Sequence, residues 1–336
     1  MVQRLWMLLS HVSCSSGREW SLDDCRAIAP LTLEINQLKK EKNAIILAHS
    51  YVGPEIVYGV ADFKSDSYAL ALEAKNIHAE MIIFAGVVFM AETAKLVCPN
   101  SKVYVPDLAS GCSLADSLDA RQLRELKLKY PKAAVVCYIN STAEVKAESD
   151  VCVTSSNVYE IVEKLPEQEI LFVPDRLMAD NLRDEMKKRG SNKIIYSSNG
   201  TCFVHDKFDP SLIDEQKSRT PGIKVVAHPE CTQAVVAKAD FVGSTGAMMN
   251  YVKKTEAPAF MMLTECGLVS RLEMENEGKS FVSSCKMCSY MKLNNLKKIR
   301  DVLYAPTPAQ EITVDPLIAK KALATIDRMF ELTGAK

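Results

Sequence analysis

The sequence has almost no net charge. Its 41 Lys and Arg residues are balanced by 42 Asp and Glu residues, which leaves −1 at pH 7. Proteins that bind nucleic acid or membrane surfaces usually concentrate one sign of charge, so this balance argues against both kinds of partner. We therefore expect no nucleic-acid partner and no membrane partner.

Long hydrophobic runs are also missing. The apolar run nearest the start, Leu5-Trp6-Met7-Leu8-Leu9, is too short to span a bilayer. Its flanks fit the pattern of a signal peptide poorly. We interpret this run as part of a frayed N-terminal extension, and we expect a cytoplasmic protein.

Closely spaced cysteines are scarce, although the chain has eleven. An odd number scattered among β-branched runs lacks the density of a secreted disulfide scaffold and favours a reducing compartment. Cys285 and Cys288 alone have the Cys-x-x-Cys spacing of a compact zinc site. By itself this pair is compatible with half a zinc site, a redox dithiol or no function. Because cysteine is among the most buried residue types, we expect a structural role for five others. These are Cys98, Cys137, Cys152, Cys231 and Cys266.

What the sequence does contain is an internal repeat of three copies. Each copy opens with an apolar run that ends in a polar cluster, continues through a hydroxyl-rich turn, and finishes with a lone cysteine. These cysteines are Cys112, Cys202 and Cys288, which lie 90 and 86 residues apart. The spacing is too long for a solenoid unit and fits a triplicated domain.

The apolar runs predict an α/β fold. They are continuous rather than alternating, which is typical of strands buried on both faces, and they alternate with helical segments, which predicts parallel sheets. We therefore expect three similar three-layer α/β/α domains. The predicted bounds are an N-terminal extension over 1–27, repeats over 28–113, 114–202 and 203–288, and a C-terminal helical segment over 289–336 that packs back on the core.

Single elements can be predicted in the same way. In the second copy we expect strands over 134–139, 150–154, 170–173 and 193–198, and helices over 142–148, 158–165 and 177–188. Further helices are predicted over 114–129, 210–217, 291–303 and 316–332. The third apolar run of each copy leads to an acidic helix start, at Glu92, Asp180 and Glu265.

The repeat gives the three lone cysteines a possible shared role. If the copies pack around an axis, the thiolates of Cys112, Cys202 and Cys288 meet at one point. Three thiolates suit a soft metal centre such as an iron–sulfur cluster. A four-iron cluster held by three cysteines leaves one iron free to act as a Lewis acid.

Other polar residues recur at equivalent places. The hydroxyl turns contain Ser67, Ser155, Ser244 and Thr245, each just before a predicted helix. Helix starts attract anions, so three such turns around one axis predict a site for a small polyanionic molecule.

The histidines add a candidate for acid–base chemistry. His49 and His228 end equivalent strands, and Tyr138 takes that place in the second copy. His228 lies beside Glu230, which favours acid–base work. His11 and His78 have no predicted function, and His205 is interpreted as packing near the metal centre.

Together these residues resemble the quinolinate synthase family. The matching segments are 46–51, 54–56, 84–95, 111–116, 138–141, 154–157, 202–205, 228–231, 243–245 and 288–292, within a similarity that runs from about 28 to 332. So many ordered matches form a strong signal. The sequence has Ser50 where the family often has an aromatic residue, and Ser65 where it usually has glycine.

The resemblance implies three α/β domains in a pseudo-threefold arrangement around a central site. It implies condensation of iminoaspartate with dihydroxyacetone phosphate to quinolinate, with loss of phosphate and two waters. An aspartate oxidase or dehydrogenase would supply the iminoaspartate. Cys112, Cys202 and Cys288 would hold a [4Fe–4S] cluster.

The resemblance also assigns roles in the pocket. Tyr51, Tyr138, His228 and Glu230 would take part in proton transfer and intermediate binding. The substrate-binding residues would be His49, Ser67, Asn140, Ser155, Ser244 and Thr245. Two alternatives remain: another [4Fe–4S]-dependent hydro-lyase, and a non-catalytic iron–sulfur sensor.

Overall fold

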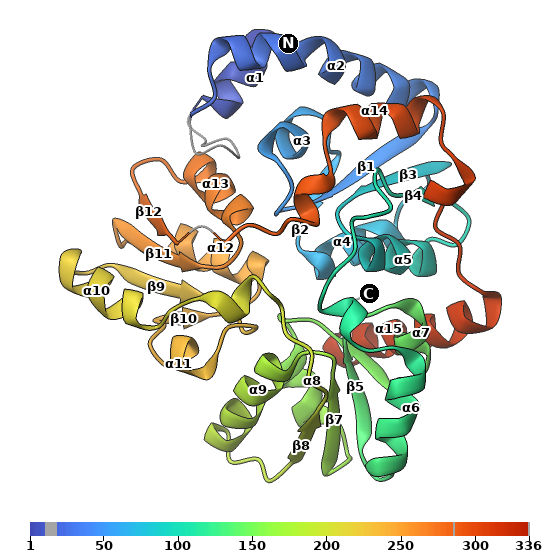
Figure 1. Cartoon of the computed structure of the whole chain (residues 1–336), viewed down its shortest axis with the longest axis vertical. Coiled ribbons are helices and arrows are strands. Elements are labelled where there is room, and N and C mark those ends of the chain that lie inside the picture. The colour runs from blue at the N-terminus through green and yellow to red at the C-terminus, as the bar shows by residue number, and fades with distance from the viewer. Residues whose placement is uncertain (11–18, 285, 335–336) are drawn as a thin grey trace. The chain divides into compact units, whose positions relative to one another are not determined.

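The computed structural model describes residues 1–10, 19–284 and 286–334. The predictions that concern His11 and Cys285 lie outside these residues. Figure 1 shows a chain of alternating helices and strands. Among the described residues, no helix combines the length and the apolarity needed to cross a lipid bilayer.

The strands form three parallel sheets of four, which confirms the predicted fold class. The strand orders are β2-β1-β3-β4, β6-β5-β7-β8 and β10-β9-β11-β12, so each sheet arranges its strands in the same order along the chain. The strands are β1 (Ala44–His49), β2 (Phe63–Ser65), β3 (Met81–Ala85), β4 (Lys102–Tyr104), β5 (Ala134–Tyr138), β6 (Val151–Val153), β7 (Glu169–Val173), β8 (Ile194–Ser197), β9 (Lys224–Ala227), β10 (Phe241–Val242), β11 (Ala259–Leu263) and β12 (Ser280–Ser283).

Helices connect successive strands and lie along the sheets (Figure 1). The α-helices are α1 (Val2–Leu9), α2 (Leu22–Glu41), α3 (Pro54–Gly59), α4 (Ser67–Lys75), α5 (Val88–Val97), α6 (Ala120–Lys129), α7 (Ala143–Ala147), α8 (Val158–Lys164), α9 (Arg176–Lys188), α10 (Ser211–Arg219), α11 (Gln233–Val236), α12 (Thr245–Lys254), α13 (Cys266–Glu275), α14 (Leu296–Tyr304) and α15 (Pro316–Thr333). Short 3-10 helices are η1 (Ala115–Ser117), η2 (His205–Lys207), η3 (Met291–Leu293) and η4 (Pro308–Gln310).

The continuous apolar runs form the strands because both faces of each sheet are covered. Every residue of β3, β5 and β11 is buried. A half-exposed sheet would require alternating polar residues, which these strands lack. The burial of both sheet faces, from which parallel sheets were predicted, is therefore observed in the structure.

The chain divides into two compact units, each made of two segments. The first contains residues 1–111 and 249–313, and the second contains 112–248 and 314–336. Within the first unit α14 packs against α2 and β3. Within the second, α15 packs against α7, β6 and α8. The boundaries predicted from the repeat, and its pseudo-threefold arrangement, stay predictions.

Three local predictions were wrong. The stretch over 114–129 is broken into η1 and α6, because the carboxylate of Asp119 caps α6 by accepting the N–H of Gln122 over 2.7 Å. Asn295 likewise separates η3 from α14, where one helix was expected, by accepting the N–H of Lys298 over 2.9 Å. The N-terminal run does not fray, because Leu5 and Leu9 are buried in a cluster with Cys25 and Ala29.

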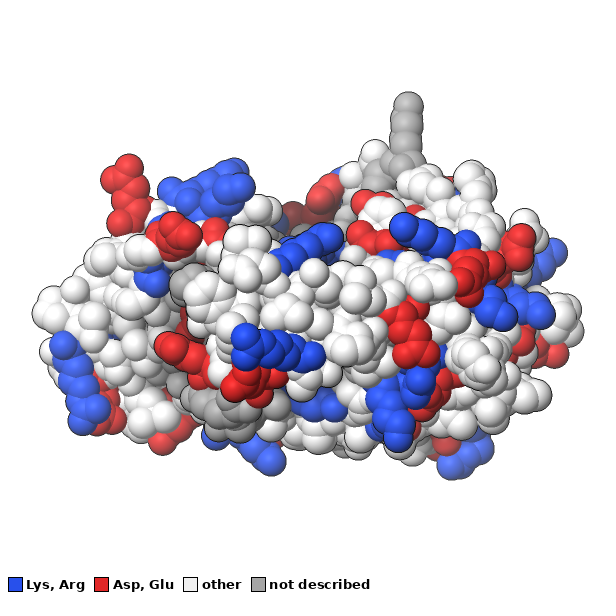
Figure 2. Space-filling model, turned by 90° about the horizontal axis from the view of Figure 1, so that it is seen from above, with Lys and Arg blue, Asp and Glu red and all other residues white. Residues whose placement is uncertain are grey.

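Charged side chains are interspersed on the surface. On the face drawn in Figure 2, Lys and Arg side chains alternate with Asp and Glu side chains across uncharged surface. The described part of the chain contains nine cysteines, and all nine are free thiols.

Candidate metal and substrate site

The three repeat cysteines lie in loops with one shared backbone geometry. Each cysteine lies three residues before a short 3-10 helix: Cys112 before η1, Cys202 before η2 and Cys288 before η3. The carbonyl oxygen of each accepts the backbone N–H four residues further on, over 2.8, 2.9 and 3.2 Å in chain order. Equivalent hydrogen bonds of this kind establish that the three cysteines occupy equivalent positions.

Each cysteine loop is also tied to its sheet in the same way. The carbonyl oxygen two residues before the cysteine accepts the first N–H of the helix that follows the third strand of the sheet. The pairs are Ser110 with Val88, Gly200 with Arg176 and Lys286 with Cys266, at 2.8, 2.8 and 3.4 Å. The start of α5, α9 or α13 therefore positions the cysteine of its own copy.

In the second unit, the thiols of Cys112 and Cys202 are close enough to interact electrostatically. Burial, and then the neighbouring Glu230 and Cys112, raise the pKa of Cys202 well above its ordinary value. The backbone N–H groups of His205 and Val204 point at the Cys202 sulfur and oppose that rise. The loop thus offers soft sulfur with hydrogen-bond donors already directed at it, which fits a thiolate bound to iron.

The cysteine loop of the first unit repeats this arrangement. Burial raises the pKa of Cys288, and the backbone N–H groups of Met291 and Tyr290 point at its sulfur and counteract the rise. The donor set in both loops fits the soft centre predicted from the sequence.

Glu230 lies at the centre of a buried hydrogen-bonded group in the second unit. Its Oε1 accepts the hydroxyl of Tyr138 over 2.6 Å and the amide of Asn140 over 3.5 Å. Its Oε2 is 2.9 Å from Nδ1 of His205. Burial by itself would raise the pKa of Glu230, but the His228 and His205 rings and the bonds from His205 and Tyr138 outweigh it and hold that pKa well below its usual range. Glu230 is therefore an ionised carboxylate.

Tyr138 and His228 beside it are neutral. Burial, followed by the Glu230 charge, raises the pKa of Tyr138 well above its ordinary value, and the Ser155 side chain hydrogen-bonds to Tyr138. Burial lowers the pKa of His228 to about 3. The His228 ring stacks on the His205 ring with 4.6 Å between centroids. The carboxylate of Glu230 thus lies beside a neutral tyrosine and a neutral histidine.

His228 and His49 adopt the same tautomer. Nδ1 of His228 accepts the backbone N–H of Glu230, and Nδ1 of His49 accepts that of Tyr51, each over 3.3 Å. A ring nitrogen that accepts carries no proton, so the proton is on Nε2 in both neutral rings. Equivalent histidines in two copies therefore present Nε2–H donors.

Asp175 is a second buried carboxyl group beside Glu230. It caps α9, where its Oδ1 accepts the N–H of Met178 over 2.9 Å. Its Oδ2 is buried with no hydrogen-bond partner among the described residues. Burial and then the Glu230 charge raise the pKa of Asp175 well above its ordinary value. The pKa values of the two carboxyl groups are thus shifted in opposite directions.

In the first unit, Glu265 ties the Cys288 loop to Tyr51. Its fully buried carboxylate accepts the N–H of Gly267 at 2.5 Å and the N–H of Cys288 at 3.1 Å, and it lies 3.2 Å from Nζ of Lys292. Nζ of Lys292 also donates to the carbonyl oxygen of Tyr51 over 2.5 Å. The Tyr51 hydroxyl is 2.9 Å from Oγ1 of Thr264. One ion pair therefore fixes a candidate catalytic tyrosine and a candidate metal ligand.

Three of the four predicted hydroxyl residues lie at helix starts, and Ser155 lies three residues before α8. Ser244 accepts the N–H of Ala247 over 3.2 Å at the start of α12, whose first residue is Thr245. Ser67 is the first residue of α4, but the cap is Asp66, which accepts the N–H of Ala69 over 3.0 Å. Ser155 follows β6 and contacts Tyr138.

The structure brings many predicted residues together within each unit. Glu230, His228, Tyr138, Asn140 and Ser155 form one group, near Cys202. His49 and Tyr51 are neighbours in the first unit, with ring centroids 4.5 Å apart, and Lys292 connects Tyr51 to the Cys288 loop. Their functional roles stay predictions.

Sequence reasoning missed four residues of these groups. These are Asp175, His205 as a partner of Glu230, Glu265 as a partner of the Cys288 loop, and Lys292. The Cys-x-x-His spacing from Cys202 to His205 could have indicated that His205 belongs to the site. The acidic helix starts were partly misassigned, because Asp180 lies inside α9 and Asp175 caps it. Glu92 likewise lies inside α5, whose N-cap is Val87.

Comparisons with known proteins agree with the resemblance. The family model described as NadA, Quinolinate synthetase A protein, matches residues 33–331. A protein of Sinorhizobium medicae strain WSM419 named quinolinate synthase is 44% identical over 314 residues, which cover 94% of this chain and 84% of that protein. Quinolinate synthase of Chloroherpeton thalassium is 44% identical over 309 residues, covering 89% of this chain and 94% of that protein. A protein of the same name from Caulobacter vibrioides strain NA1000 is 41% identical over 311 residues, covering 91% of this chain and 83% of that protein. The predicted family is confirmed, and the chain belongs to the quinolinate synthetase A family.

Proposed function

We propose that the protein is a quinolinate synthase, which condenses iminoaspartate with dihydroxyacetone phosphate and releases phosphate and two waters. The observation that carries this proposal is the shared geometry of the three cysteine loops, in a chain that belongs to this family. Family membership supports the reaction, and the loops support the cofactor. The cell compartment that we propose is the cytoplasm, with an aspartate oxidase or dehydrogenase as the source of iminoaspartate.

The cofactor that we propose is a [4Fe–4S] cluster held by Cys112, Cys202 and Cys288. The support is the donor set: three thiols in equivalent loops, with backbone N–H groups directed at the sulfurs of Cys202 and Cys288. When bound, the cluster would supply an iron without a protein ligand that acts as a Lewis acid.

Glu230 is the proposed proton acceptor. It is ionised, it is buried, and the Tyr138 hydroxyl bonds to it over 2.6 Å. The hydrogen bonds that keep this carboxylate ionised also make it a weak base, so we propose that it accepts a proton when substrate replaces one of them, and that Tyr138 passes a proton along its own bond to Glu230. The Tyr51 hydroxyl is the corresponding donor proposed in the first unit, where Thr264 orients it.

The remaining predicted residues are proposed to bind substrate. The Nε2–H groups of His49 and His228 can donate to carboxylate or phosphate oxygens, as can the hydroxyls of Ser67, Ser155, Ser244 and Thr245. The side-chain oxygen of Asn140 is buried and has no partner among the described residues. It can therefore accept a hydrogen bond from the substrate nitrogen.

Anaerobic purification followed by an activity assay tests the proposal. We expect a brown protein with iron and sulfide near four each per chain, and quinolinate from the two substrates. Cys112→Ala, Cys202→Ala and Cys288→Ala should each lose cluster and activity, with Cys285→Ala as the matched control that keeps both. A colourless protein that retains zinc would contradict the cofactor. A cluster without quinolinate formation would favour another hydro-lyase or a sensor.

A further inference from the structure

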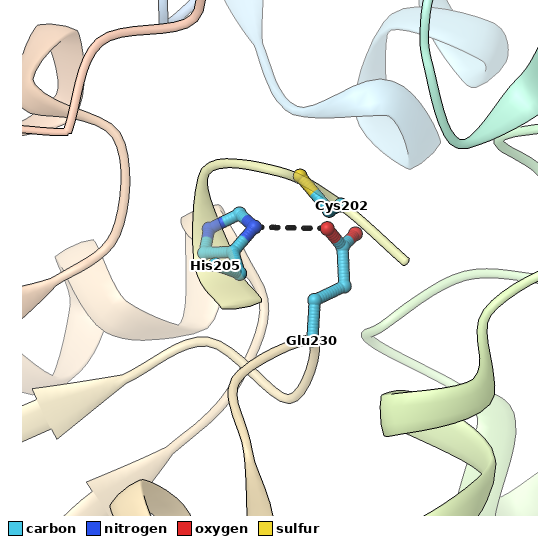
Figure 3. Close-up of side chains that lie close together, drawn as sticks. All are labelled: Cys202, His205 and Glu230. Atoms are coloured by element: carbon cyan, nitrogen blue, oxygen red, sulfur yellow. Dashed lines mark hydrogen bonds and ion pairs between the residues drawn. The ribbon is translucent and has the colours of Figure 1, made fainter. Parts of the chain in front are cut away.

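Three different metal-ligating side chains meet in the second unit. The Sγ of Cys202, a ring nitrogen of His205 and a carboxylate oxygen of Glu230 all lie within 4.8 Å of one another. Figure 3 shows the three side chains converging, with His205 and Cys202 on one loop and Glu230 on another. His205 and Glu230 are 3% exposed. A half-buried thiol together with a buried imidazole and a buried carboxylate forms a donor set typical of zinc-like ions.

The local backbone fixes two of the donors. Cys202 and His205 have Cys-x-x-His spacing, and His205 is the first residue of η2. The carbonyl oxygen of Cys202 accepts the N–H of Asp206 over 2.9 Å, which closes the turn between them. The stacked ring of His228 supports the His205 ring. This part of the site is therefore in place before a metal arrives.

Neighbouring side chains orient the third donor. The Tyr138 hydroxyl binds Oε1 of Glu230 over 2.6 Å, so Oε2 is the oxygen that faces Nδ1 of His205, 2.9 Å away. Hydrogen bonds of this kind to a ligating carboxylate raise metal affinity by holding it in one orientation. Tyr138 is thus an outer-shell partner of the three donors.

The distances suit a single ion. Zinc binds nitrogen and oxygen at about 2.0–2.2 Å and sulfur at about 2.3 Å, which places tetrahedral ligand atoms roughly 3.4–3.7 Å apart. The three atoms lie within 4.8 Å of one another, and the His205–Glu230 pair must open from 2.9 Å by roughly half an ångström. A thiolate and a carboxylate together balance the charge of a divalent ion, which removes the cost of burying it alone.

We propose that Cys202, His205 and Glu230 form a mononuclear site for a divalent transition-metal ion in the cluster-free protein. Zinc, cobalt and ferrous iron match the mixed sulfur, nitrogen and oxygen donors, whereas magnesium and calcium prefer oxygen alone. Binding displaces the Cys202 thiol proton to solvent, the His205 ring coordinates through a nitrogen that carries no proton, and no electron is transferred.

The site and the proposed cluster exclude each other, because both use the sulfur of Cys202. Zinc bound here would block cluster assembly. This exclusion rests on the proposed function, whereas the mononuclear site itself does not.

Cobalt binding to cluster-free protein under anaerobic conditions tests the site. One equivalent of Co²⁺ should give a thiolate-to-cobalt charge-transfer band and the strong visible bands of tetrahedral cobalt, and Zn²⁺ should remove both. His205→Ala and Glu230→Gln should each weaken Co²⁺ binding by at least ~100-fold, and Tyr138→Phe by ~10-fold. Circular dichroism establishes that each variant is folded, and Glu230→Gln keeps the shape of the site if His205→Ala does not fold.

Cys288→Ala is the control that separates the two metal centres. It should keep the cobalt spectrum and affinity while failing to assemble a cluster. Loss of cobalt binding in Cys288→Ala, unchanged binding in both His205→Ala and Glu230→Gln, or a spectrum without thiolate bands would overturn the site. Zinc added before iron and sulfide should block assembly in the unaltered protein, and unblocked assembly would overturn the exclusion. If the protein makes no quinolinate but binds cobalt as described, the proposed function fails and the site stands.

Discussion

Replacing Lys292 with methionine removes the ammonium group that faces Glu265. The Glu265 side chain is 0% exposed and that of Lys292 is 20% exposed, with 3.2 Å between Nζ and Oε1. Methionine keeps most of the aliphatic volume, so the change is mainly one of charge. Burial raises the pKa of Glu265 and the Lys292 charge opposes that rise, so without Lys292 the buried carboxyl group would keep only its backbone donors from Gly267 and Cys288.

The size of the effect follows from this burial. Removing one partner of a buried ion pair costs about 3–5 kcal/mol, because an uncompensated charge remains. The partial exposure of Lys292 and the two backbone donors to Glu265 place the expected loss near the lower end, at about 3 kcal/mol. Adding Glu265→Gln to Lys292→Met should recover part of that loss, since a neutral amide needs no cation. The recovered stability should be about 0.5–3 kcal/mol, which is the range of coupling energies between neighbouring groups.

Urea unfolding of the cluster-free protein measures these differences. The matched control is Arg121→Met, which breaks an exposed i,i+4 pair whose side chains are 70% and 62% exposed. That change should cost no more than about 0.5 kcal/mol. If Lys292→Met costs no more than Arg121→Met, the buried pair does not stabilise the fold. If the double variant is as unstable as the single one, Lys292 acts through its bond to the Tyr51 carbonyl instead.

Three further predictions concern pH and packing. Burial holds the pKa of His228 at about 3, so the unfolded chain binds a proton at higher pH than the folded one; stability should be full above pH ~6.5 and fall as the pH drops, by up to about 1.4 kcal/mol per unit. Histidine NMR spectra should show a neutral His228 ring at pH ~5.5, and a charged ring there would refute this. Burial raises the pKa of Asp175 in the folded protein. The contribution of this carboxyl group to folding stability is therefore fully present below its unfolded pKa of ~3.9, and it is lost as the pH rises through its raised pKa in the folded protein. In urea unfolding, the free energy of unfolding of Asp175→Asn should therefore rise relative to that of the unaltered protein from pH 5 to pH 8. The same difference between the two proteins at pH 5 and at pH 8 would contradict the raised pKa. A Cβ at Gly267 would lie 2.8 Å from the Tyr51 carbonyl oxygen, so Gly267→Ala should lower stability by about 1–3 kcal/mol. Gly59→Ala, whose Cβ would meet nothing closer than 3.5 Å, is the control, and equal midpoints for the two variants would exclude a clash.

The sheets could be predicted from the sequence because a strand buried on both faces is apolar along its whole length. The run Met81–Ala85 forms β3, and the run predicted over 134–139 forms β5 with one residue fewer. Helix ends were harder, because they depend on single capping side chains. Asp119 and Asn295 each begin a new helix inside a stretch that looked continuous.

The same distinction between local patterns and long-range contacts applies to the candidate site. Glu230 could be found because it follows His228 in a strand end that recurs in the repeat. Its bonds to His205 and Tyr138 join residues 25 and 92 positions apart, and no local pattern encodes them. The Glu265–Lys292 pair similarly depends on how a helix start meets a loop.

The division of the chain has a consequence for its synthesis on the ribosome. Residues 1–111 share a compact unit with 249–313, and residues 112–248 share theirs with 314–336. At roughly 5–20 residues per second, the first segment waits on the order of ten seconds or more for the rest of its unit to be translated. The second waits for α15, which covers β6 and places Thr325 Oγ1 3.1 Å from the sulfur of Cys152. Neither unit can complete its interior until most of the chain has been made. We therefore expect nascent chains that stall before α15 to expose apolar surface that chaperones bind.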